Sequence, residues 1–174
     1  GTGVQAHSHL AAVSELFPLK RIRACGRGQA NIEKLCDHAR NLGLEAEGTA
    51  DAEYALRDAD LVVTSVTMDF TIAPFLDARW LKPTAFAAIT DAGIPWIGES
   101  MTAFKTVIVD DRTQEYESDK PILPYEQITG DLMELVSQDI AVDPNGQPTA
   151  FAFRGIALGD YAAAVLAVRR AASR

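Results

Sequence analysis

The chain opens with Gly1-Thr2-Gly3-Val4-Gln5-Ala6, a glycine-rich string of the form GxGxxA. In dinucleotide-binding folds such a string follows a buried strand and begins a helix. No strand precedes it in this sequence. The string is therefore either accidental or part of a domain whose first strand is missing, and the pattern that follows it decides between the two.

Helix-like and strand-like patterns alternate after this string. Apolar residues recur at helical spacing over residues 4–17, which Pro18 ends, and over residues 31–42, which Gly43 ends. Strand-like segments follow these helices, at residues 21–25, 44–48, 61–64, 85–89 and 106–109. Apolar strands that alternate with helices indicate a parallel sheet covered on both faces. We therefore predict an α/β fold of the Rossmann type, a doubly wound, mostly parallel sheet that lacks its first strand.

In such a fold the opening loop binds a pyrophosphate. Gly1 and Gly3 leave room for the phosphates at the backbone. The free amide hydrogens of Thr2, Val4 and Gln5 point at them from a helix N-terminus, where the helix dipole favours an anion. We expect these five residues to bind the cofactor, and the simpler alternative is a plain tight turn.

Composition narrows the range of functions. The 174 residues predict one domain with an ordinary core, and 24 acidic against 16 basic residues give a net charge of -8 without a basic stripe for nucleic acid. The longest apolar runs are too short for a membrane span. Cys25 and Cys36 fit no zinc motif, and we expect no metal site and two reduced cysteines in a cytoplasmic protein.

The turn after the second expected strand bears on the choice of cofactor. NAD-binding sites usually place an acid there for the ribose hydroxyls, whereas this sequence reads Cys25-Gly26-Arg27-Gly28. Arg27 can bind a 2′-phosphate by charge-assisted hydrogen bonds and stack on adenine. The turn thus favours NADP over NAD, although a solvated arginine in an NAD site is the alternative.

Four stretches of the sequence resemble the ornithine cyclodeaminase/mu-crystallin family, in order and with similar spacing along nearly the whole chain. They are the opening string, Ala-Asp-Leu-Val-Val-Thr at residues 59–64, Leu-Lys-Pro-Thr at 81–84 with Ala-Ile-Thr-Asp at 88–91, and Thr-Ala-Phe-Ala-Phe-Arg-Gly-Ile-Ala-Leu-Gly-Asp at 149–160. The resemblance covers only the nucleotide-binding half of the family, whose members are nearly twice as long.

The resemblance also implies a domain organisation. Residues 1–148 would form the NAD(P)-binding domain, truncated at its N-terminus. Residues 149–174 would be a crossover and a C-terminal helix that packs on a missing substrate-binding domain, through which members form homodimers. Without that partner, the apolar surface of the last helix would be exposed.

Asp91 is the residue that the resemblance places beside the substrate nitrogen, as a general acid/base or an orienting group. A carboxylate suits this role because it accepts a hydrogen bond from an ammonium group and exchanges a proton with amine or water. The structural alternative is a cap on turn amides. Further cofactor contacts are expected from Thr64, Ser65, Val66 and Gly155.

Two residues depart from the family pattern near the expected substrate mouth. Trp96 can form a wall of the pocket or simply pack in the core. Arg154 adds a positive charge that would suit a second substrate carboxylate, as in a dicarboxylic imine, and a surface salt bridge is the plainer alternative.

The resemblance thus implies an NAD(P)-dependent oxidoreductase of small amino or imino acids, with hydride transfer at the α-carbon. We favour an imine reductase or amino-acid dehydrogenase over a cyclodeaminase, because the segments around the substrate differ from the cyclodeaminase pattern. A non-catalytic protein that binds NADPH and a small ligand, like mu-crystallin, is the third reading.

Overall fold

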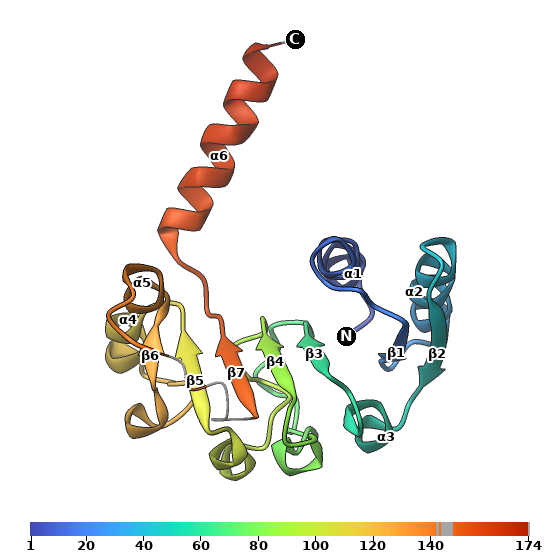
Figure 1. Ribbon diagram of the computed structural model, residues 1–174, viewed down its shortest axis with the longest axis horizontal. Coiled ribbons are helices and arrows are strands. Elements are labelled where there is room, and N and C mark those ends of the chain that lie inside the picture. Colours follow the sequence, from blue (N-terminus) through green and yellow to red (C-terminus); the bar gives the residue numbers. More distant parts are fainter. Residues whose placement is uncertain (142, 144–147, 174) are drawn as a thin grey trace.

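The computed structural model describes residues 1–141, 143 and 148–173. Its strands form two parallel sheets, one of two strands and one of five (Figure 1). The strands are β1 (Arg21–Cys25), β2 (Glu45–Thr49), β3 (Leu61–Thr64), β4 (Phe86–Ile89), β5 (Thr106–Val109), β6 (Gly130–Asp131) and β7 (Thr149–Ala152). The predicted α/β fold with a parallel sheet is therefore confirmed.

The larger sheet has the order β3-β4-β7-β5-β6, and every pairing in it is parallel. Strand β7 lies at its centre, with Ala150 opposite Ala87 on one side and opposite Val107 on the other. The sheet thus takes in residues beyond 148, in a stretch that the family resemblance placed in the crossover. Four strands of this sheet are short and apolar, as expected for strands covered on both faces.

Helices and short 3₁₀ turns connect the strands. The α-helices are α1 (Val4–Leu16), α2 (Gln29–Asn41), α3 (Ala52–Leu56), α4 (Arg112–Glu117), α5 (Leu132–Ser137) and α6 (Ala157–Ala172), and the 3₁₀ turns are η1 (Ala78–Trp80), η2 (Gly98–Ala103) and η3 (Tyr125–Gln127). The two helices predicted from periodicity, α1 and α2, occur within one or two residues of their expected bounds.

Two hydrophobic clusters correspond to the two sheets. The larger cluster packs around β4, β5 and β7 and includes Ile89, Val107 and Trp96. The smaller joins α1 and α2 to β1, through residues such as Leu10 and Leu35. Both cysteines are free, and Cys36 is buried in the smaller cluster.

The C-terminal helix α6 extends away from the sheets (Figure 1) and has no buried residue over its described length. Leu158, Tyr161 and Val168 are each more than two-thirds exposed. The apolar surface that the sequence predicted for this helix is therefore exposed.

Two short helices begin at aspartate caps. Helix α4 begins after the cap residue Asp111 and buries Glu115. Asp131, at the end of the edge strand β6, caps α5 in a capping box with Glu134.

Candidate nucleotide and substrate site

The opening glycine loop lies at the carboxyl ends of β1 and β3. The amino group of Gly1 donates a hydrogen bond to the carbonyl of Cys25, the last residue of β1, at 3.2 Å. On its other side Gly1 touches Ser65, which follows β3, so closely that a Cβ atom would lie 2.2 Å from the Ser65 carbonyl oxygen. Gly1 is therefore a glycine because the backbone of the next strand leaves no room for a side chain.

The space beside the Cα atom of Gly3 is open. It is the N-cap of α1, its φ of -83° suits any residue, and a Cβ atom added to it would meet no atom within 4 Å. No side chain caps this helix, and its first turn carries no acidic residue. The free amides of Val4 and Gln5 and the positive end of the helix dipole are thus open to an anion, as the sequence predicted for a phosphate loop.

Thr2 joins this loop to the next turn. Its side chain is buried, and a Cβ atom on Gly26 would lie 2.7 Å from its hydroxyl oxygen.

Arg27 follows in the same turn and is exposed, with no hydrogen bond or ion pair to any described residue. Hydrogen bonds from Thr71 hold the pKa of Asp69 below its usual range, and the nearby charge of Arg27 lowers it further. Arg27 lines a cavity of about 1600 Å³ together with Gly1, Gly3 and Thr67 of the loop that follows β3.

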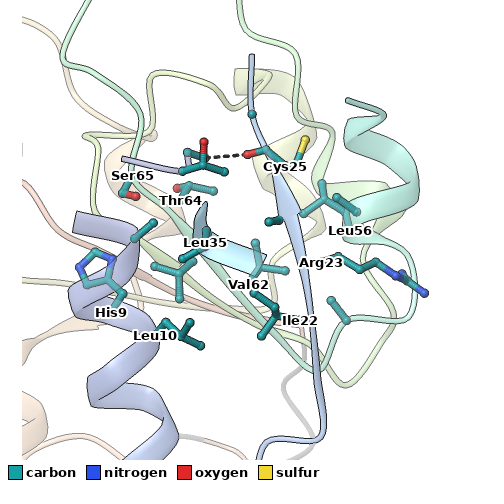
Figure 2. Close-up of a pocket in the computed structure, with 18 of the residues that line it drawn as sticks. His9, Leu10, Ile22, Arg23, Cys25, Leu35, Leu56, Val62, Thr64 and Ser65 are labelled. Carbon is teal, nitrogen blue, oxygen red and sulfur yellow. Dashed lines mark hydrogen bonds between the residues drawn. The ribbon is translucent and has the colours of Figure 1, made fainter. Parts of the chain in front are cut away.

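A buried polar cluster occupies the carboxyl ends of β3 and β4. Asp91 is 1% exposed, and its carboxylate accepts hydrogen bonds from the Thr64 hydroxyl and the Val66 amide, each at 3.0 Å. The Trp96 indole nitrogen lies 3.3 Å from the Thr64 hydroxyl oxygen. Asp91 thus orders the backbone of residues 64–66, where cofactor contacts were predicted. Ser65 and Val66 line the cavity beside Gly1 (Ser65 and Thr64 are labelled in Figure 2).

Burial changes the acidity of Asp91. Loss of solvation raises the pKa of its carboxyl group above the ordinary 3.8, and the hydrogen bonds from Val66 and Thr64 offset part of this rise. A carboxyl group that keeps its proton to higher pH can act as a proton donor. The turn that follows it is strained, since Ala92 adopts a φ of 51°, and this sharp reversal fixes the position of Asp91.

Trp96 and Arg154, the two residues expected near the substrate mouth, both have partners within the protein. Trp96 is 3% exposed and packs edge-to-face on Phe104 in the larger cluster, at 5.7 Å between ring centroids. These contacts agree with the alternative in which Trp96 packs in the core and does not line a substrate pocket. The Arg154 guanidinium forms a salt bridge with Glu115, Nε to Oε2 at 3.0 Å, and also donates to the Lys120 carbonyl at 2.8 Å.

Asp110 is a site residue that sequence reasoning did not single out. This buried carboxylate follows β5, and its Oδ2 accepts hydrogen bonds from the Arg154 amide at 3.0 Å and the Gly155 amide at 2.6 Å. Gly155 has a φ of 120°, a conformation that favours glycine. Asp110 and Gly155 therefore set the direction in which the chain leaves β7 toward α6. The only sequence signal for it was an acid directly after an apolar strand.

The comparisons with known proteins agree with this geometry. Residues 1–173 match the model of the ornithine cyclodeaminase/mu-crystallin family. The chain belongs to this family. Among curated members, ketimine reductase mu-crystallin of Rattus norvegicus is 30% identical over 172 residues, which cover 95% of this chain and 52% of the relative. The chain thus spans about half the length of the curated relatives it matches.

Solved structures of the family share the fold. The Δ1-pyrroline-2-carboxylate reductase of Thermococcus litoralis, in complex with NADH and L-proline, has a TM-score of 0.81 at 19% identity, and the match covers 99% of this chain and 57% of that one. An archaeal alanine dehydrogenase dimer with bound NAD has a TM-score of 0.82 at 20% identity, covering 99% and 56%. The Rossmann-type prediction is therefore confirmed.

Two features are absent from the residues that the structure describes. No helix among them combines the length and apolar character needed to cross a bilayer. Nor do three His, Cys, Asp or Glu side chains within residues 1–141, 143 and 148–173 come together as a group able to hold a metal ion.

The raised pKa of Asp91 predicts a pH-dependent stability. Below pH 3.8 the carboxyl is protonated in both the folded and the unfolded chain, and as the pH rises through its raised value the folded state must ionise a buried group. Asp91 therefore contributes stability at low pH that is lost as the pH rises. In D91N this contribution disappears, so Tm should fall less from about pH 4 to pH 8 than in the wild type.

The control for this measurement is D60N. Asp60 is exposed and pairs with Lys82, which lowers its pKa, so its contribution has the opposite sign and is lost as the pH falls. Tm values that respond to pH equally in the wild type and D91N would contradict the account of Asp91.

The Arg154–Glu115 pair predicts a large loss of stability on truncation. R154A leaves the carboxylate of Glu115, 2% exposed, without its cationic partner, and we expect a cost of about 3–5 kcal/mol in the free energy of unfolding. R57A, which removes an exposed pair with Glu53, should cost less than about 1 kcal/mol. Equal effects of the two variants in urea unfolding would show that the Arg154 pair is not structural.

Proposed function

We propose that this chain is the nucleotide-binding half of an NAD(P)-dependent oxidoreductase that acts on small amino or imino acids. The proposal rests on one observation. The N-terminus of α1 has no side-chain cap and faces open space at Gly3. It lies at the same carboxyl edge of the strands as the buried carboxylate of Asp91. Family membership and the NADH and NAD bound by the two solved relatives support it.

The residues of the loop fit a dinucleotide. A pyrophosphate over Gly3 would accept hydrogen bonds from the amides of Val4 and Gln5. Ser65 lies beside Gly1, and its neighbours Thr64 and Val66 donate hydrogen bonds to Asp91, so this segment links the loop to Asp91. When bound, the nicotinamide supplies or accepts the hydride.

Asp91 is the group that this chain offers for proton movement. In imine reduction, one hydride reaches the α-carbon and one proton reaches the nitrogen, so a group that holds a proton is needed beside the nitrogen. The raised pKa of Asp91 suits it to hold that proton and to deliver it to the imine nitrogen, and the carboxylate left behind would stabilise the iminium that forms. The name of the curated relatives, ketimine reductase, supports reduction of an imine. Cyclodeamination would use the same half-reaction in the oxidative direction.

A non-catalytic binding protein is the second candidate. The burial of Asp91 favours it, because this carboxylate is 1% exposed and already accepts hydrogen bonds from two groups of the protein. D91N separates the two in a polypeptide that joins this chain to a substrate-binding half. An enzyme should lose turnover at least a hundred-fold while it retains nucleotide affinity. Ligand binding without turnover in both forms would support the binding protein.

Substitution of Gly3 tests the phosphate loop. A Cβ atom at this position meets nothing in the protein, so G3A should fold with a change of about 1 kcal/mol or less, yet the added methyl should obstruct the pyrophosphate and weaken NADPH binding at least ten-fold. G98A is the matched control, because Gly98 also lies in open space but belongs to η2. Unchanged affinity in G3A by isothermal titration would contradict this assignment.

Substitution of Arg27 tests the choice of cofactor. If its guanidinium binds a 2′-phosphate, R27A should weaken NADPH about ten- to a hundred-fold and leave NADH nearly unchanged. R21A removes an arginine from the opposite end of β1 and should change neither. Equal loss for NADH and NADPH in R27A would contradict an NADP-specific role.

A further inference from the structure

The near-complete burial of Asp91 raises the question of how a substrate reaches it. The proposed reaction needs its carboxyl group beside a substrate nitrogen, yet Asp91 is 1% exposed. Three segments that are far apart in the sequence meet here: residues 67–74 after β3, the turn 91–95 after β4, and residues 118–123 after α4. Their contacts show which of them is fixed and which is held loosely.

Residues 67–74 run along the turn that begins with Asp91, and we call them the flap. Just before the flap, the Val66 amide donates to the Asp91 carboxylate at 3.0 Å. Just after it, the amides of Phe75 and Leu76 both donate to the Pro95 carbonyl at 2.8 Å. The two ends of the flap are therefore anchored to the two ends of the turn.

Between these anchors the flap has few ties. All its residues except Ile72 are exposed. Within the described part of the chain, its hydrogen bonds stay inside the flap: the Asp69 carboxylate accepts from the Thr71 amide and hydroxyl, and the Asp69 carbonyl accepts from the Ile72 amide. A segment with local hydrogen bonds and few buried side chains opens more easily than the elements beneath it.

The segment after α4 is held firmly by contrast. The Arg154 guanidinium donates to the Lys120 carbonyl at 2.8 Å. It also pairs with the Glu115 carboxylate, 2% exposed, which accepts a hydrogen bond from the Ile122 amide. The Ile122 side chain packs on Gly93, where a Cβ atom would lie 2.7 Å from the Ile122 Cγ2 atom. A buried ion pair thus fixes this segment against the turn that the flap follows.

One contact joins the flap to this fixed segment. The Lys120 ammonium group lies 5.1 Å from the centroid of the Phe70 ring, within the range of a cation–π interaction. Phe70 is 57% exposed, and the ammonium group forms no ion pair with any described residue. Lys120 therefore ties the middle of the flap to a segment that packs on the other side of the turn.

We propose that Lys120 and Phe70 are positioning residues: their contact keeps the flap closed over Asp91, and its release admits a substrate to the carboxyl group. Thr67 and Ile72 of the flap line the same cavity as the glycine loop, so the flap also borders the nucleotide site. The need for a substrate to reach Asp91 rests on the function proposed above, whereas the contact between the flap and the fixed segment does not.

Chemical labelling of Asp91 tests the proposal in the 174-residue chain, without nucleotide or substrate. A water-soluble carbodiimide with glycinamide converts accessible carboxyl groups to amides, and peptide mass spectrometry gives the rate at each position. Asp60, whose side chain is 89% exposed, is the internal reference. Asp91 reacts only when it is uncovered, so its rate relative to Asp60 follows the fraction of open flap.

The variants K120M and F70L each break the contact with little change of size. K120M removes the charge from a long side chain, and F70L keeps an apolar side chain without the aromatic face. We expect each variant to raise the relative labelling rate of Asp91 about two- to five-fold, the factor that an exposed cation–π contact contributes to an equilibrium. The double variant should label no faster than either single variant, because the two residues act through one contact.

Conservative variants and a distant lysine are the controls. K120R keeps the cation and F70W keeps an aromatic face, so both should label at the wild-type rate or more slowly. K105M removes an exposed lysine that directly precedes β5, and should leave the rate unchanged.

Three results would overturn the proposal: wild-type rates in both K120M and F70L, a double variant whose effect is the product of the two single effects, or equal acceleration in K120R and F70W. The function is tested separately by D91N in the polypeptide joined to a substrate-binding half. Unchanged turnover in D91N, with labelling rates that follow the contact, would overturn the proposed role of Asp91 in the reaction and leave the flap standing.

Discussion

Parallel pairing of β3, β4, β7 and β5 is the constraint on which the rest of the structure depends. Because these strands run in one direction, their carboxyl ends meet at one edge, and the chain segments that leave them are brought together there. Thr64, Asp91 and Arg154 are far apart in the sequence, yet each follows or ends a strand of this sheet. The glycine loop reaches the same edge through the contact of Gly1 with Ser65.

Buried carboxylates bind these segments to one another. Asp91, after β4, accepts hydrogen bonds from the end of β3 and from the loop beyond it, and Asp110, after β5, accepts two amides from the segment beyond β7. In each case an acid that follows one strand satisfies backbone amides that follow another, which would otherwise be buried without acceptors. The same arrangement raises the pKa of Asp91, because loss of solvation acts on a carboxyl group confined among neighbouring loops.

The sequence allowed prediction of the elements that carry their own periodic signal. The helices α1 and α2 and the strands β1, β2, β3, β4 and β5 follow from local patterns, and so does the glycine-rich turn that begins α1. The central strand β7 was not assigned as a strand, because four residues between a turn and a crossover carry little signal, and their place follows from pairing with β4 and β5. The burial of Glu115 also escaped prediction, since its partner Arg154 comes from a distant segment.

The central claim is that a dinucleotide binds at the N-terminus of α1, and residue-resolved NMR tests it most directly. On titration with NADPH, the backbone amide signals of Gly3, Val4 and Gln5 should shift progressively, together with those of Arg27 and Gly28 beyond β1. The amides of α6, which extends away from the sheets, should not move. Shifts confined to α6, or none at saturating NADPH in a folded chain, would contradict the account.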